Sequence, residues 1–199
     1  ADLNVMRQTL LFNMLEAVAL NANRKNSDLQ LYEFGNCYFH DAEKRTDENP
    51  LAAYSEEYRL AVAVTGLAVP QSWNAKPEKA SFFTLRAVAE KLLRRFGVDI
   101  YALKTESLQS DLYGEGLSMS LGNRELLQIG TVSGRIRRIL DVKQEVYFME
   151  VNFDALVRST KKHKIAAEEL SKFPEVKRDL ALLVDKQVTF SALRDVAFA

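Results

Sequence analysis

The sequence predicts an α+β fold, in which helices flank an antiparallel or mixed sheet, and three observations point to it. Strand-like segments follow one another without the long crossover that parallel neighbours require. Segments with helical periodicity stand apart from these strand-like runs. The chain has 199 residues, of which 47% are hydrophobic and 27% charged. A chain of this length buries about 70% of its unfolded surface, so it needs no disulfide or metal for stability.

The first expected element is an amphipathic helix over residues 5–23. Leu11, Leu15, Val18 and Ala22 recur at helical spacing and define one apolar face. The Asn-rich segment after it predicts a polar turn.

A long apolar segment, residues 29–39, follows this turn. Leu, Tyr and Phe occupy both alternating phases, which is typical of a strand buried on both faces, so we expect a central strand bent at Gly35. Residues 40–50 are polar and end in proline, which predicts a loop. Residues 58–69 predict a second buried strand, and residues 70–77 an irregular segment.

The clearest helix is expected over residues 81–97. Ser81 can cap its start by accepting an early backbone N–H, and Gly97 ends it. Apolar residues line one face of this segment, and Arg, Lys and Glu line the other.

The next part of the chain predicts short strands and short helices. Gly122-Asn123 stands between two strand-like runs, which predicts a hairpin over residues 116–132. The other expected elements are a strand at 98–106, a short helix at 134–141, a strand at 146–153 and a short helix at 153–160.

These elements form one expected domain, residues 1–160. Residues 161–175 are charged, lack a sustained apolar period and contain a proline, so we expect a linker. Residues 176–186 then predict a strand, and residues 189–199 a helix. One strand and one helix cannot bury their apolar faces alone. This tail is therefore expected either to dock on the first domain or to begin a second domain.

Charge and hydropathy limit the classes of function. Lys+Arg and Asp+Glu each number 27, so the net charge is zero and no global positive field attracts nucleic acid. RNA contact would need a local patch, and the candidates are Arg94-Arg95, residues 135–138 and residues 161–164. Solvated helix faces are the favoured interpretation of all three. No apolar stretch approaches the roughly 18 residues that span a bilayer.

Residue patterns for catalysis or metal binding are weak. Cys37 and His40 form C-x-x-H, half of a zinc site, but a buried cysteine and a strand-end histidine are the favoured interpretation. A single cysteine fits a reducing cytoplasm. Gly114-Glu115-Gly116 lacks the third glycine and the following helix of a phosphate-binding loop, so the start of the hairpin is the better explanation.

Three stretches resemble, in the same order, segments of the bacterial phenylalanyl-tRNA synthetase beta subunit family. Residues 6–39 are similar to its M/L-R-x-S/T-L-L segment, its N-x-N-R-K turn and its L-F-E-I-G strand. Residues 72–86 are similar to its S-W and D-F-F-D-L-K segments. Residues 171–181 are similar to its K-F-P-x-V-R-R-D-L-A signature, which opens the C-terminal anticodon-binding domain.

The resemblance implies a fragment with a class II aminoacyl-tRNA synthetase-like core domain over residues 1–160. It also implies that residues 176–199 are the first strand and helix of a truncated ferredoxin-fold anticodon-binding domain. In this family the alpha subunit makes phenylalanyl-adenylate, and the beta core domain packs against it without catalysing a reaction. ATP and Mg are then used by the whole cytoplasmic complex, an alpha2-beta2 heterotetramer that charges tRNA(Phe). Neither is expected to bind this chain.

Two arginines of class II catalysis are missing in our alignment. One lies on a strand in an R-x-E setting and holds the ATP α-phosphate, because a planar guanidinium matches phosphate oxygens. Here Leu31 stands two positions before Glu33. The other follows a G-x-G-x-x-R turn, and here Met119 takes its place. Charge on the transferred phosphate would lack its stabilising cations, so we expect no catalytic, cofactor or metal residues.

Candidates for contact with the alpha subunit or tRNA are Arg7, Arg24, Lys25, Lys177 and Arg178. Exposed charges at helix ends or on the tail strand are the alternative interpretation. Apolar candidates for the subunit interface, with core packing as an equal alternative, are Met6, Leu10, Leu11 and Met14.

Two other functions remain open. One is a self-sufficient enzyme that binds ATP or an amino acid. The other is a free-standing RNA-binding or protein-interaction module of the same fold, against which the zero net charge argues for RNA.

Overall fold

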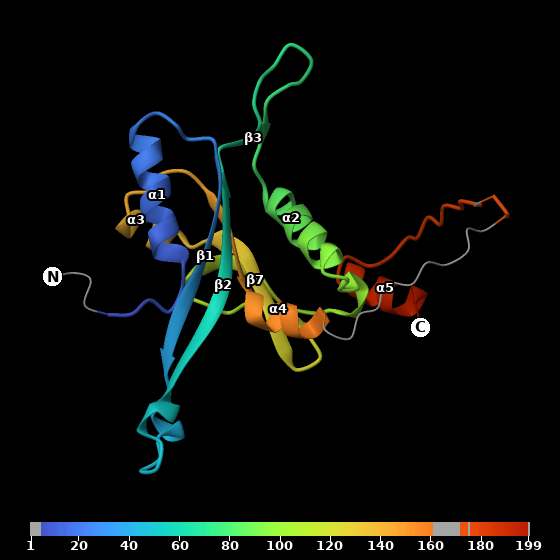
Figure 1. Ribbon diagram of the computed structural model, residues 1–199. Coiled ribbons are helices and arrows are strands. Elements are labelled where there is room, and N and C mark those ends of the chain that lie inside the picture. Colours follow the sequence, from blue (N-terminus) through green and yellow to red (C-terminus); the bar gives the residue numbers. More distant parts are fainter. Residues whose placement is uncertain (1–4, 161–171, 175, 199) are drawn as a thin grey trace. The chain divides into compact units, whose positions relative to one another are not determined.

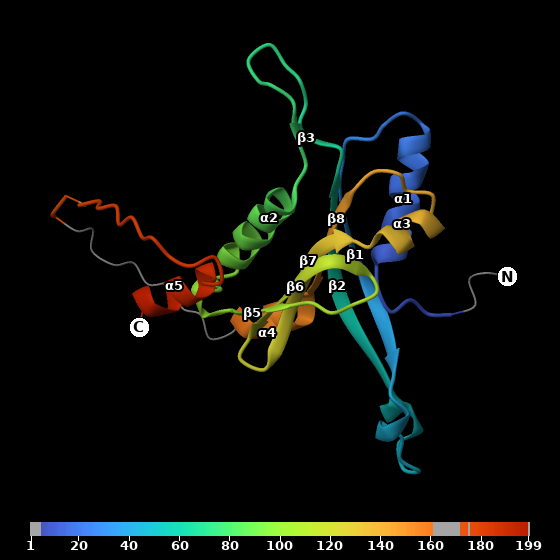
Figure 2. The ribbon, with the colours of Figure 1, turned by 180° about the vertical axis from the view of Figure 1, so that it is seen from behind.

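The structure is a computed structural model that describes residues 5–160, 172–174 and 176–198. It divides into two compact units, residues 1–163 and residues 164–199. The first unit is built on a six-stranded sheet in the order β1-β2-β8-β7-β6-β5 (Figure 1; Figure 2 gives the opposite view). All neighbouring strands run antiparallel, which confirms the predicted α+β class.

The strands of this sheet are β1 (Leu29–His40), β2 (Tyr54–Thr65), β5 (Lys104–Ser107), β6 (Tyr113–Leu121), β7 (Arg124–Val132) and β8 (Val146–Asn152). The helices of the first unit are α1 (Leu11–Asn23), α2 (Phe82–Arg95), α3 (Gly134–Ile139) and α4 (Phe153–Thr160). A small separate sheet pairs β3 (Leu67–Val69) with β4 (Glu78–Lys79). Short 3-10 turns lie at Ala42–Lys44, Pro50–Ala53 and Ile100–Ala102.

The sheet has a core on each face, because successive side chains of a strand point to opposite faces. On β2, Leu60 and Val64 belong to one cluster with α2 and α4, whereas Ala61 and Ala63 belong to the other with α1. Figure 1 shows α1 and α3 on one side of the sheet and α2 and α4 on the other. Burial on both faces explains why the central strands read as continuous apolar runs.

The expectation that residues 29–39 form a central strand is wrong, because β1 lies at the edge of the sheet. It pairs with β2 over its whole length, from Leu29 opposite Thr65 to His40 opposite Tyr54. Its apolar character has two causes. Leu29 and Cys37 face the core beside α1, whereas Tyr32 and Phe34 on the opposite face are exposed.

Helix α1 begins at Leu11, six residues later than predicted. The backbone N–H of Tyr38 donates to the carbonyl oxygen of Arg7 at 2.8 Å, so the preceding segment lies along the edge of β1. The helix buries Leu11, Leu15 and Val18, which confirms its predicted apolar face.

The predicted ends of α2 are confirmed. The hydroxyl of Ser81 accepts the N–H of Thr84, and the Thr84 hydroxyl accepts the N–H of Ser81, which completes a capping box. Gly97 has φ 73° just past the helix, in the region that favours glycine.

The hairpin is confirmed as β6 and β7, and its turn places Gly122 at φ 59°. Gly114 to Gly116 lie within β6, as the hairpin interpretation required.

Two predicted strands have different bounds. The segment 58–69 is divided at Gly66, where φ is 73°, so β2 ends and β3 begins in a separate sheet. The strand predicted at 98–106 forms only from Lys104, because residues 100–102 make a 3-10 turn. The Asp99 carboxylate stabilises that turn by accepting the N–H of Tyr101 at 2.9 Å.

The second unit contains one helix among its described residues, α5 (Phe190–Ala197), whose start is capped by the Thr189 hydroxyl. The strand predicted at 176–186 is wrong for the described residues, which form no ladder there. A strand needs a neighbour to accept and donate its backbone hydrogen bonds, and the described part of this unit supplies none. Most of the predicted linker, residues 161–171 and 175, lies outside the described residues.

Candidate functional site

Three charged side chains meet on the α1 side of the sheet, where β2 and β8 pair. Arg59 Nη1 donates to Glu150 Oε2 at 2.5 Å, and Arg59 Nη2 donates to Glu57 Oε2 at 2.7 Å. The side chain of Glu150 is 7% exposed and that of Arg59 is 20% exposed. We call Glu57, Arg59 and Glu150 the carboxylate clamp.

The clamp holds the arginine in its charged form. Burial acts to lower the pKa of Arg59, but the carboxylates of Glu57 and Glu150 outweigh it and raise the pKa above its usual range. The guanidinium also lies 5.0 Å from the centre of the Phe39 ring. Its donors are therefore engaged by groups of the chain itself.

The same carboxylate positions the start of α1. Glu150 Oε1 accepts the backbone N–H of Leu10 at 2.7 Å and the hydroxyl of Thr9 at 2.9 Å. A helix leaves its first N–H groups without intrahelical partners, and here a residue from the far end of the domain satisfies one of them. Sequence reasoning missed this site, although Glu150 is the one charged residue of β8 and so gave a signal.

Beside the clamp lies a hollow of about 300 Å³, which we call the polar hollow. Its charged lining residues are Glu57, Arg59, Arg124, Glu125 and Glu150. Three carboxylates therefore face two guanidinium groups, and one of these, that of Arg59, is already bound. Glu125 accepts hydrogen bonds from Ser118 and Gln128 at 2.6 and 2.9 Å. These residues do not fit a nucleoside triphosphate, because its negative charge would meet an excess of carboxylates.

The two positions aligned with catalytic arginines do not meet in one site, so that alignment is corrected. Leu31 is on β1 and packs against the core beside α1, whereas Met119 is on β6 and is buried in the other core. Three strands separate β1 from β6, and strands are spaced about 4.8 Å apart. The carboxylate clamp lies between these two positions, on the α1 side of the sheet.

A second surface feature is formed by Tyr32, Phe34 and Tyr58, which we call the aromatic edge. Phe34 stacks on Tyr58 with ring centres 5.9 Å apart, and Tyr32 packs edge-on to Phe34 at 6.3 Å. The residues are 74%, 43% and 40% exposed in the order Tyr32, Phe34, Tyr58. The N–H of Tyr38 points away from β2, and backbone direction alternates along a strand, so the backbone groups of Tyr32 and Phe34 point outward too.

The predicted contact residues are not brought together. Arg7 is half-buried and forms an ion pair with Glu33 at 2.7 Å, while its Nε donates to the Asn36 carbonyl oxygen at 3.0 Å. Arg24 and Lys25 are exposed at the end of α1, where Lys25 has φ 64°.

Lys177 and Arg178 are exposed and belong to the second unit. Of the apolar interface candidates, Leu10, Leu11 and Met14 are buried in the core, and Met6 is 60% exposed.

Cys37 and His40 do not begin a metal site among the described residues. No group of three or more His, Cys, Asp or Glu residues gathers there to hold an ion. Cys37 is buried in the core, and burial, with Glu150 next in effect, raises the pKa of its thiol to about 11. His40 packs against Tyr54 with ring centres 4.8 Å apart.

A comparison with known protein families shows to which family this chain belongs. Residues 1–153 match the family described as the phenylalanyl-tRNA synthetase beta chain CLM domain. The chain belongs to this beta chain family. The carboxylate clamp, the aromatic edge and the charged lining residues of the polar hollow all lie within the matched residues.

Curated relatives of this beta chain domain are whole beta subunits. The phenylalanine–tRNA ligase beta subunit of Bacteroides thetaiotaomicron is 45% identical over 199 residues, which is all of this chain and 24% of that protein. The beta subunit of Porphyromonas gingivalis is 43% identical over 197 residues, 98% of this chain and 24% of that protein. The chain thus spans about a quarter of the length of the curated relatives it matches.

Solved structures support the class II synthetase fold of the beta chain domain. Pyrrolysyl-tRNA synthetase from Desulfitobacterium hafniense superimposes with a TM-score of 0.54, over 79% of this chain and 51% of that one. Sequence identity is 15%, so the likeness concerns the fold alone. In the described part of the beta chain domain, no helix has both the length and the hydrophobicity to cross a bilayer.

Proposed function

We propose that this chain is a non-catalytic, synthetase-like part of the beta subunit of phenylalanine–tRNA ligase. In this proposal it packs with the alpha subunit and supports the ATP-dependent charging of tRNA(Phe) with phenylalanine. ATP and Mg serve the complex through the alpha subunit. The complex is a cytoplasmic alpha2-beta2 heterotetramer, and this chain binds no cofactor itself.

The observation that carries the non-catalytic role is the carboxylate clamp. Phosphoryl or adenylyl transfer needs cations aimed at the phosphate oxygens, and that electrostatic contribution is usually the largest in such catalysis. Arg59 instead donates to Glu57 and Glu150 at 2.7 and 2.5 Å. Freeing it would leave the 7% exposed Glu150 carboxylate without its cation, which is costly inside a protein.

The aromatic edge supports the packing role. A long edge strand with open backbone groups and exposed aromatic side chains is a template for pairing with another chain, and monomeric proteins usually protect such edges. β1 spans 12 residues and pairs with a strand on one side. The names of the relatives, beta subunits, imply a complex with an alpha subunit. We therefore propose the alpha subunit as the partner that covers this edge.

Tyr32→Lys in the full-length beta subunit, co-expressed with the alpha subunit, tests this proposal. A charge on the edge should hinder strand pairing and reduce assembly, measured by native mass spectrometry. Phe83→Lys is the matched control, because Phe83 on α2 is 73% exposed and Tyr32 is 74% exposed. The control variant should assemble normally.

Hydrogen exchange of the beta subunit with and without the alpha subunit gives a second readout. Peptides that cover β1 should exchange more slowly in the complex. If no peptide of residues 5–160 gains protection, this part of the chain does not pack with the alpha subunit and the proposal is wrong.

A further inference from the structure

The turn after α1 and the loop before β8 form one continuous surface. Gln144 Nε2 in the loop donates to the carbonyl oxygen of Ser27 in the turn at 3.0 Å. The elements behind them share a core, since Ile136 and Leu140 pack against the cluster that contains Val18. Segments more than 100 residues apart in sequence are therefore neighbours here.

This surface carries an excess of exposed cations, which we call the basic surface. Its members are Arg24, Lys25, Arg135, Arg138 and Lys143. Among the described residues, no carboxylate lies within ion-pairing distance of any of them. The whole chain has a net charge of zero, so this is a local departure from the average.

Two carboxylates near the basic surface have partners of their own. Asp28 accepts the N–H of Leu67 at 2.8 Å, and Glu145 accepts the hydroxyl of Tyr147 at 3.1 Å. Asp141 lies in the loop that carries Lys143, and Asp111 lies beside Ser133, whose hydroxyl donates to the Asp111 carbonyl oxygen at 2.9 Å. The five cations outnumber these four carboxylates, so the surface is positive.

Hydrogen bonds hold the backbone of the basic surface in one conformation. The N–H of Lys25 donates to Ala22 and that of Asn26 to Asn21, at 2.9 and 3.0 Å, which closes the end of α1. The loop is held by Arg137, whose Nη1 donates to the carbonyl oxygen of Gln144 at 2.9 Å. A surface that is already ordered loses less entropy when it binds.

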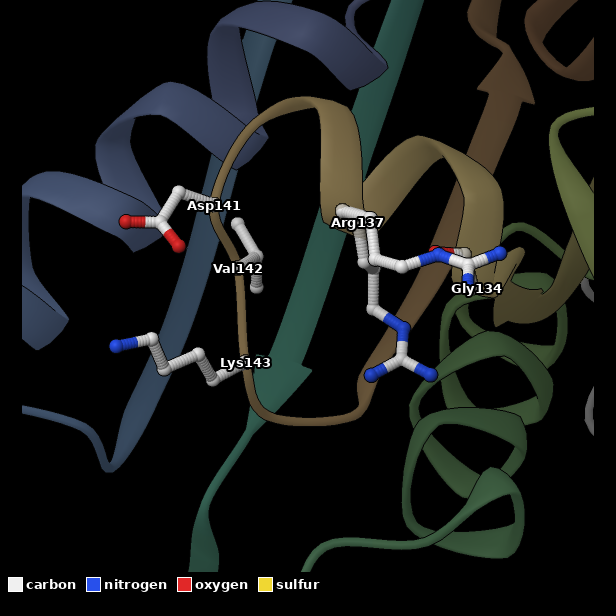
Figure 3. A pocket seen from close by; sticks show the side chains of 6 residues that line it. Gly134, Arg137, Asp141, Val142 and Lys143 are labelled. Atoms are coloured by element: carbon white, nitrogen blue, oxygen red, sulfur yellow. The ribbon is translucent and has the colours of Figure 1, made fainter.

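Arg137 and Lys143 project to different sides of the loop before β8. Figure 3 shows Asp141 and Lys143 projecting to one side of the loop, while Arg137 projects to the other. Together with Gly134, Arg138 and Val142 they line a hollow of about 400 Å³. Arg137 therefore acts as a brace, and Lys143 remains available to a ligand.

We infer that the basic surface binds the phosphate backbone of the ligase's tRNA substrate. This inference rests on the proposed function, because it takes the chain to be part of a tRNA-charging complex. Nucleic-acid backbones carry closely spaced negative charges, and exposed Lys and Arg neutralise them without reading the sequence. The large exposed apolar side chains nearest to these cations in the sequence are Leu20 and Ile139, aliphatic residues without the aromatic plane on which bases stack. The contact is thus to phosphates and not to bases.

The test uses the assembled alpha-beta complex with a triple variant of the beta subunit, Arg24→Gln, Lys25→Asn and Lys143→Gln. Asn at position 25 tolerates the positive φ of Lys25. The equilibrium dissociation constant for tRNA(Phe) is measured over a series of salt concentrations. We expect an increase of about tenfold at low salt, and a plot of log affinity against log salt that is shallower by about 2.

A second triple variant, Lys91→Gln, Arg94→Gln and Arg95→Gln, removes the same charge from exposed positions on α2 and should keep the wild-type slope. An unchanged affinity and slope in the first variant, in a complex that assembles and activates phenylalanine normally, would overturn the inference and leave the proposed function intact. Equal losses in both triple variants would also overturn it, because only net charge would then matter. Failure of the wild-type beta subunit to assemble with the alpha subunit would instead reject the proposed function.

Discussion

The Glu150 carboxylate accepts the backbone N–H of Leu10 at 2.7 Å, although 140 positions separate the two residues in the sequence. One oxygen of this side chain fixes the start of α1, and the other binds Arg59 on β2 at 2.5 Å. Strand β8, strand β2 and helix α1 are thus joined by a single buried charge. The carboxylate that engages Arg59 therefore also stabilises the fold.

Glu150→Gln should lower the free energy of unfolding by about 2–4 kcal/mol, because it removes the charge that pairs with Arg59 in a buried site. The amide nitrogen of glutamine would also face Arg59 or the N–H of Leu10, which are donors whose hydrogen bonds Glu150 now accepts. Urea denaturation followed by circular dichroism measures the change. Glu57→Gln is the matched control and should cost less, since the Glu57 side chain is 35% exposed. Equal costs for the two variants would mean that burial of Glu150 is not what matters.

Gly35→Ala should destabilise the chain by about 1–2 kcal/mol through Arg7. A Cβ at position 35 would overlap the Arg7 guanidinium, which crosses the strand there to reach Glu33. Gly114→Ala is the control and should be nearly neutral, because its nearest atoms would be 3.9 Å away. The cost of Gly35→Ala should shrink in an Arg7→Ala background. If it stays the same, the overlap with Arg7 is not the cause.

The buried thiol of Cys37 predicts a loss of stability at high pH. Burial raises its pKa in the folded chain from 9.0 to about 11, whereas the unfolded thiol keeps the lower value. Below pH 8 both states are protonated and the thiol contributes no pH dependence. Between pH 9 and 11 the unfolded state alone releases the proton, so the free energy of unfolding should fall by up to about 2 kcal/mol.

The comparison with Cys37→Ala isolates this effect, since all tyrosines titrate in both proteins. Urea denaturation at pH 8 and at pH 10.5 should give a smaller difference for the alanine variant. Identical pH dependence in the two proteins would contradict the assignment.

The capping box of α2 predicts that Ser81→Ala lowers the free energy of unfolding by about 1 kcal/mol. The lost hydroxyl removes the side-chain acceptor of the Thr84 N–H at the start of the helix, which then keeps only its bond to the Ser81 carbonyl oxygen. Thermal unfolding should show a lower midpoint for this variant than for Ser107→Ala, an exposed position in β5. A midpoint equal to that of the control would show that the cap contributes little.

Local signals predicted well those element ends that a capping residue or a glycine marks, because such signals act over a few residues. Ser81, Gly97 and Gly122 stand where a cap or a positive φ is needed, and each is found in that role. The edge position of β1 could not be derived in this way. Its apolar run comes from a core on one face and an exposed aromatic edge on the other, and composition does not separate these two causes.

The carboxylate clamp was beyond local reasoning for a similar physical reason. It depends on β2 lying between β1 and β8, which places Arg59 near Glu150 across 91 positions. The strand predicted at 176–186 failed because β propensity does not form a ladder without a neighbouring strand. The family resemblance, by contrast, needed no three-dimensional information, and the match over residues 1–153 confirmed it.

The number of ATP sites in the purified alpha-beta complex tests the central claim most directly. Isothermal titration with ATP and Mg should give one site for each alpha-beta pair, because Arg59 in the beta chain is engaged by Glu57 and Glu150. Two sites for each pair, the second lost when residues of the polar hollow are substituted, would contradict the account.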